Sequence, residues 1–93
     1  MFVGVLQVDL GIPGAFSLKD KRRVVKSVLE RIRRSFGVTA AEVGDLETWN
    51  RARLGIAFVS NDRRHAESQL GKVVAALSSH RDAVVVDHQM EIL

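Results

Sequence analysis

The sequence of 93 residues contains no cysteine, so it can form no disulfide, no zinc–thiolate site and no thiol nucleophile. Proline is almost absent, and we find no linker, repeat or low-complexity segment. No apolar run approaches the roughly 18 residues that a membrane-spanning helix needs. The N-terminal segment also lacks the basic region that precedes the apolar part of a secretory signal. These absences predict a cytoplasmic protein with no membrane partner.

What is present is the composition of a folded domain. Hydrophobic residues make up 46% of the chain and charged residues 27%, which is typical of globular proteins and not of disordered ones. A chain of this length can build one two-layer core but not two. We therefore predict that residues 1–93 form a single domain.

The net charge of +3 is unevenly distributed along the chain. Residues 17–36 carry eight of the fourteen Lys and Arg residues against only Asp20 and Glu30, whereas the other residues carry six basic groups against nine acidic ones. A local excess of one sign creates a field that attracts a partner of the opposite sign. The basic character thus belongs to one element.

The hydrophobic pattern predicts six elements in the order β-α-β-β-α-β. Ser17 with Asp20 resembles a capping box, and Gly37 is placed to stop the helix at about Phe36. Ser60 or Asn61 is predicted to cap a second helix that reaches about residue 79. The predicted strands span residues 2–10, 38–43, 51–60 and 83–93.

This order favours an α+β, ferredoxin-like sandwich, with a four-stranded antiparallel sheet and both helices on one face. Of the two possible registers, the one of lower free energy buries the apolar residues of strands one and three and leaves Gln7, Asp9 and Arg53 on the open face, because burial of an unpaired charge is unfavourable. That register excludes an RNA-recognition domain, whose aromatics stand on the open face and stack bases. The residues that this register buries are Phe2, Leu6, Leu54, Ile56 and Phe58.

Other motifs support neither a phosphate-binding loop nor a catalytic site. The Gly11-x-x-Gly14 spacing resembles the phosphate clamp of K-homology domains, but that clamp joins two helices, whereas this segment follows a strand. The same loop lacks the arginine of acylphosphatases. His88 alternates with core residues and is interpreted as a core histidine. With no metal or triad spacing, we expect no enzyme activity, no metal and no cofactor.

The first helix separates an apolar face from a basic one. Like charges at i and i+4 repel by tenths of a kcal/mol, so the basic face is either simply solvated or a binding surface for phosphates or an acidic protein. The basic residues opposite the core are Lys19, Arg22, Arg23, Lys26, Arg33 and Arg34.

Lys21 instead falls on the face directed at the core. Its stem could leave the first turn for solvent, or Lys21 could join Lys19 and the loop N–H groups in an anion site at the helix N-terminus. We include Lys21 among the candidate nucleic-acid-binding residues on the second interpretation. Trp49, the only tryptophan, either covers the end of the core or contacts a partner.

The open face of the sheet is predicted to carry a valine-rich patch. An exposed patch of this kind usually marks a contact surface, and a two-fold dimer would pair it with its own copy. We therefore expect a homodimer or higher oligomer. The predicted interface residues are Val3, Val5, Ala57, Val59 and Val85.

Two long segments, PGAFSLKDKRRVVKSVLERIRRSFGVTAAEVGD and WNRARLGIAFVSND, resemble the YlxP-like family of small bacterial proteins. The most specific parts are Ser17-Leu18-Lys19-x-Lys21-Arg22, Ala41-Glu42-Val43, and Trp49 with Arg51-Ala52 and Leu54-Gly55. The resemblance implies a ferredoxin-like domain without an established activity. The family's genes often lie beside those for translation and ribosome maturation, including ribosome-binding factor A, which implies a connection with RNA or the ribosome.

The sequence therefore predicts a binding module that docks on structured RNA or a ribosomal particle through the helix from Lys19 to Arg34. The alternative is a structural or regulatory homo-oligomer that uses its open sheet face and binds no nucleic acid.

Overall fold

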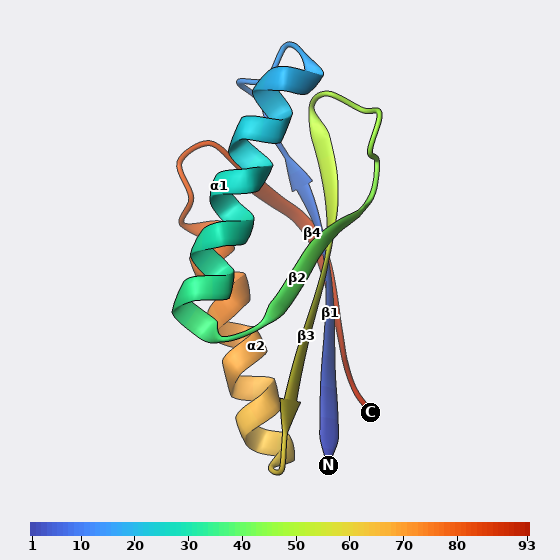
Figure 1. The fold of residues 1–93 in the computed structure, drawn as a ribbon, viewed down its shortest axis with the longest axis vertical. Helices are drawn as coiled ribbons and strands as arrows, with labels where there is room; N and C mark the ends of the chain where they lie inside the picture. The colour runs from blue at the N-terminus through green and yellow to red at the C-terminus, as the bar shows by residue number, and fades with distance from the viewer.

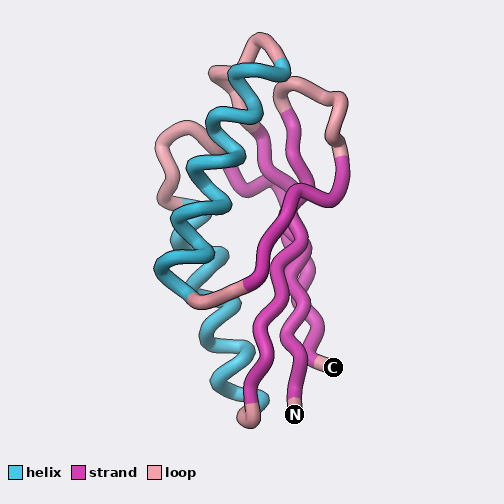
Figure 2. Tube along the Cα trace, in the orientation of Figure 1, coloured by secondary structure: helices cyan, strands magenta, loops and turns pink.

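A computed structural model describes residues 1–93 and confirms the predicted architecture. The sheet has the strand order β2-β3-β1-β4 with antiparallel neighbours, and both helices cover the same face (Figures 1 and 2). This is the ferredoxin-like sandwich. No helix is long and apolar enough to cross a membrane. The elements are β1 (Phe2–Gly11), α1 (Leu18–Phe36), β2 (Thr39–Gly44), β3 (Arg51–Ser60), α2 (Arg63–Ser78) and β4 (Val84–Ile92).

Both ends of α1 follow the local signals in the sequence. The Ser17 hydroxyl accepts a hydrogen bond from the Asp20 amide at 3.1 Å, and the Asp20 carboxylate accepts one from the Phe16 amide at 3.1 Å. Gly37 closes the helix with φ of 62° and donates to the Arg33 carbonyl. A left-handed residue at this place favours glycine because a Cβ would be strained there.

The cap of α2 differs from the prediction. Asp62, and neither Ser60 nor Asn61, is the N-cap, and its carboxylate accepts from the amides of Arg64 and His65. Ser60 is still the last residue of β3, paired with Phe2, so its backbone is not free to begin the helix. Its hydroxyl accepts from the Asp62 amide at 3.0 Å and thereby supports the true cap.

The core lies between the helices and one face of β1 and β3, as the predicted register requires. Arg53 and Asp9 lie opposite each other on the open face, and Arg53 Nε donates to Asp9 Oδ1 at 2.8 Å. This hydrogen bond and the charge of Asp9 raise the pKa of the Arg53 guanidinium. Phe2 and Phe58 are only half-buried. The buried residues at the centre are Leu6, Val8, Leu10, Leu54, Ile56, Val25, Val28, Ile32, Leu70 and Val73.

Two predictions for β4 from alternation are wrong, and a bulge explains one of them. Asp9 pairs with Asp87 but Leu10 pairs with Val85, which leaves Val86 without a partner and reverses the faces beyond it. Val85 therefore packs against the core instead of standing on the open face. His88 is exposed and is not a core histidine, although it lies opposite the buried Val8. Because β4 is an edge strand, the His88 side chain has a neighbouring strand on one side only and stays accessible to solvent on the other.

Candidate nucleic-acid interface

The outer side of α1 presents an exposed row of positive charge. We define the basic face as Lys19, Arg22, Arg23, Lys26 and Arg34. All five side chains are exposed, and none of them forms an ion pair. Because none of them pairs with an acid, their mutual repulsion favours contact with an acidic partner.

Arg33, the sixth residue predicted for the basic side of α1, makes a structural contact within the protein. Its Nε donates to the Ala40 carbonyl at 3.2 Å, and a second guanidinium nitrogen contacts the same oxygen. The side chain thus ties the last turn of α1 to β2. Its charge remains near the basic face, but its donors are partly committed within the protein.

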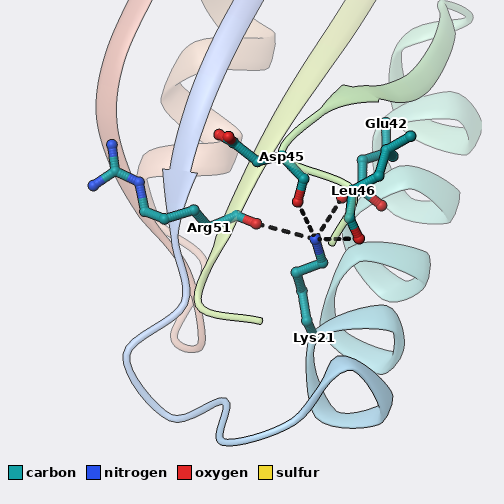
Figure 3. A network of polar contacts seen from close by, with 5 residues as sticks. All are labelled: Lys21, Glu42, Asp45, Leu46 and Arg51. Carbon is teal, nitrogen blue, oxygen red and sulfur yellow. Dashed lines mark hydrogen bonds and ion pairs between the residues drawn. The ribbon is translucent and has the colours of Figure 1, made fainter. Parts of the chain in front are cut away.

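Lys21 does not belong to the interface, and both interpretations of it were wrong. Its side chain is 0% exposed, so it neither reaches solvent nor offers a site for an anion. The ammonium donates to three carbonyls of the β2–β3 connection and lies 2.8 Å from Glu42 Oε2 (Figure 3). The carbonyls belong to Asp45 at 2.7 Å, Arg51 at 3.1 Å and Leu46 at 3.3 Å.

The chemistry of an ammonium explains this arrangement. Lysine has three N–H donors, and the three carbonyls take them all. Glu42 is therefore paired with Lys21 by charge alone, and its Oε2 atom accepts no hydrogen bond. We call these contacts the Lys21 clamp. The clamp fixes the connection that carries Trp49 against the first turn of α1.

Trp49 does not cover the core. It is 43% exposed and stacks on Phe16, which is 78% exposed, with ring centroids 6.1 Å apart and planes 27° apart. The pair lies where the loop before α1 meets the β2–β3 connection. Sequence reasoning missed Phe16, because an aromatic residue in a loop belongs to no periodic pattern. Partner contact by Trp49 remains a prediction.

The valine-rich patch on the open face is present in part. Val3 lies opposite Val59 and Val5 opposite Ala57, so these four residues are contiguous. Val59 is 59% exposed and Val5 is also exposed, whereas Val3 and Ala57 are half-buried. Val85 is absent from the patch because of the bulge.

A groove that the sequence did not reveal separates α1 from the turn after α2. Its volume is about 510 Å³, and Val24 is its only hydrophobic lining residue. Only Arg23 among its lining residues was a candidate beforehand, because the two walls are more than forty residues apart in the chain. The other lining residues are Ser27, Arg31, Ser79, His80, Arg81 and Asp82. No group of three or more His, Asp or Glu side chains is arranged to hold a metal ion.

Comparison with known proteins gives a family but no activity. The family described as "Protein of unknown function (DUF503)" matches residues 3–90. The uncharacterized protein YlxP of Bacillus subtilis (strain 168) is 39% identical over 77 residues, which cover 83% of this chain and 84% of that protein. The solved structure of LFR1 1, a de novo designed protein with ferredoxin fold, aligns with all of this chain and 84% of its own at 12% identity and a TM-score of 0.51. That structure supports the fold alone.

Proposed function

The chain belongs to the DUF503 family and is related to YlxP, and we propose that it is a cytoplasmic module that docks on structured RNA or a ribosomal particle through its basic face. The observation that carries the proposal is the row of five exposed Lys and Arg side chains without ion pairs. The resemblance to the YlxP-like family also implies a connection with ribosome maturation, which points to the same class of partner.

The basic face fits a phosphate backbone in length and chemistry. From Lys19 to Arg34 it runs about 22 Å along the helix axis at the usual rise per residue, long enough to contact several phosphates. Contacts to phosphates position a protein without reading sequence. The open sheet face carries no aromatic platform for stacking bases, which favours recognition of RNA shape over single-stranded sequence.

Salt dependence tests the proposal directly. If about five basic groups meet phosphates, the logarithm of the binding constant falls against the logarithm of salt with a slope of roughly −3.5 to −4.5. The measurement is binding of the full chain to purified ribosomal subunits and to a ribosomal RNA hairpin, from about 50 to 200 mM salt. Affinity that does not change with salt, or no binding to any of these probes, contradicts the proposal.

Matched variants locate the surface. Arg22→Gln combined with Lys26→Gln is expected to weaken RNA binding equally for different sequences and to reduce the slope by about two. The control is Arg64→Gln combined with Lys72→Gln, which removes the same charge from exposed positions of α2. Equal losses in both variants would mean that net charge, and not the basic face, drives binding.

A second candidate function is a structural or regulatory homo-oligomer, supported by the exposure of Val59 and Val5 beside Val3 and Ala57. The apolar patch and the basic face lie on opposite sides of the sheet, so the two functions are compatible. Light scattering at micromolar concentration tests it, with a dimer or larger mass expected. Val59→Lys should dissociate the oligomer without unfolding the subunit, whereas a monomer mass for the unchanged chain rejects this candidate.

A further inference from the structure

The groove between α1 and the turn after α2 is a second basic feature, and Arg23 is the one residue that it shares with the basic face. We propose that this groove binds the phosphate group of a phosphomonoester. The ligand is either a free small molecule or the 5′-phosphorylated end of an RNA, and the two sources present the same dianionic group. The inference does not rest on docking of structured RNA.

Three arginines from two separate elements line the groove. Arg23, Ser27 and Arg31 follow one another at intervals of four residues, so they share one flank of α1. Arg81 enters from the opposite wall. Arg23 and Arg31 form no ion pair, and their charge is therefore available to a ligand.

The one acid in the groove does not neutralise it. Asp82 Oδ2 lies 3.6 Å from Arg81 Nε, and the Arg81 side chain is 91% exposed, a geometry in which an ion pair is weak. Three guanidinium groups against one carboxylate leave an excess of about two positive charges in the groove. This excess matches a phosphomonoester, which carries close to two negative charges at neutral pH, better than an internal phosphodiester, which carries one.

The turn after α2 adds a directed donor. The Asp82 amide donates to His80 Nδ1 at 3.1 Å, so Nδ1 is the acceptor and the proton of the neutral ring sits on Nε2. The imidazole that lines the groove can thus donate from Nε2. The Ser79 hydroxyl is already committed as a donor to the Ala76 carbonyl at 2.9 Å, so Ser27 supplies the other hydroxyl donor that lines the groove.

The lining also indicates which part of a ligand is recognised. Guanidinium groups present planar pairs of N–H donors that match phosphate oxygens, whereas a single hydrophobic residue gives no platform for a base. A smaller hollow of about 240 Å³ shares Val24, Arg81 and Asp82 with the groove and continues along the loop from Ile12 to Ala15. The organic part of a phosphomonoester can extend into this hollow.

An NMR titration of the full chain with defined probes tests the proposal. Inorganic phosphate and a nucleoside 5′-monophosphate are expected to shift the backbone amides of Ser27, Arg31 and His80 to Asp82 in a saturable manner. The matching nucleoside should cause no such shift, and a dinucleotide with one internal phosphodiester should bind about tenfold more weakly. Equal binding of the diester and the monoester, or no saturable shift at these amides, would overturn the proposal.

A further pair of probes separates the two sources of the phosphate. A short RNA with a 5′-phosphate is compared with the same RNA carrying a 5′-hydroxyl, and both are compared with the mononucleotide. Tighter binding of the 5′-phosphorylated RNA than of the mononucleotide identifies an RNA end as the ligand. Equal binding of these two identifies a free phosphomonoester, and equal binding of the two RNAs argues against the groove as a monoester site.

Two double variants of the same helix provide the control. Arg23→Gln with Arg31→Gln removes both positive charges from the α1 wall of the groove and should weaken monophosphate binding by about tenfold or more. Arg22→Gln with Lys26→Gln removes the same charge from the basic face, outside the groove, and should leave monophosphate binding within about a factor of three. If both double variants lose monophosphate binding equally, the groove is not the phosphate site. Loss of RNA docking in the second variant with retained monophosphate binding would separate this site from the proposed function.

Discussion

Replacement of Lys21 by Met removes the ammonium at the centre of the Lys21 clamp while keeping an unbranched side chain of similar reach. The carbonyls of Asp45, Leu46 and Arg51 then lose their donor, and Glu42 loses the charge 2.8 Å away. Removing one partner of a buried ion pair costs about 3–5 kcal/mol. Because Asp45, Leu46 and Arg51 are exposed and water can reach part of the β2–β3 connection, we expect the lower end of this range, about 3–4 kcal/mol.

Such a loss is a large share of the stability of a domain this size, about 5–14 kcal/mol. Urea unfolding monitored by far-UV circular dichroism measures it for the whole fold, while the fluorescence of Trp49, the only tryptophan, reports on the connection that the clamp holds. We expect the Trp49 transition of Lys21→Met to begin at lower urea than the dichroism transition, because the connection loosens first.

Two further variants make the reasoning refutable. Lys19→Met makes the same replacement at an exposed position and should change the free energy of unfolding by no more than about 0.5 kcal/mol. Glu42→Gln keeps the three carbonyl contacts, so its cost should be about 1–3 kcal/mol, and its combination with Lys21→Met should cost less than the sum. A Lys21→Met protein within about 1 kcal/mol of Lys19→Met would refute the assigned role of the clamp.

Three other predictions concern the caps and the aromatic pair. Gly37→Ala should destabilise the fold by about 1 kcal/mol because φ is 62° there. Gly71→Ala lies inside α2, where an added Cβ would meet no other atom within 4 Å, and it should stabilise the fold by about 0.5–1 kcal/mol. Changes of the same sign for both variants in thermal unfolding would contradict this. Asp62→Ala should cost about 1 kcal/mol in urea unfolding because it removes the acceptor for two amides of α2, while Asn61→Ala should have almost no effect; the reverse order would restore Asn61 as the cap. Phe16→Ala should alter the emission of Trp49, its stacking partner, and leave the dichroism transition within about 0.5 kcal/mol, so unchanged emission would disprove the stacked pair.

The elements were predictable where the information is local. Ser17 and Gly37 mark the ends of α1 by short-range chemistry, and the alternation in β1 and β3 placed Asp9 and Arg53 on the open face, where they pair. Alternation failed at Val85 in β4 because one extra residue, Val86, exchanges the core and open faces of the strand. No residue type in the sequence indicates that bulge.

The candidate site was less predictable because its parts meet only in the fold. Periodicity correctly placed Lys21 toward the core, but its partners in the clamp lie 21 to 30 positions later in the chain. The groove likewise joins Arg23 and Arg31 to Arg81. The pattern of charges along one helix can predict an exposed row of basic residues. It cannot predict a groove whose second wall comes from a distant part of the chain.

Bulges interrupt both outer strands of the sheet. In β2, Glu42 pairs with Leu54 and Gly44 with Arg53, which leaves Val43 unpaired, just as Val86 is unpaired in β4. A foreign strand that added to either edge would lose its hydrogen-bond register at the bulge. The two bulges thereby disfavour open-ended, amyloid-like growth of the sheet through its edges.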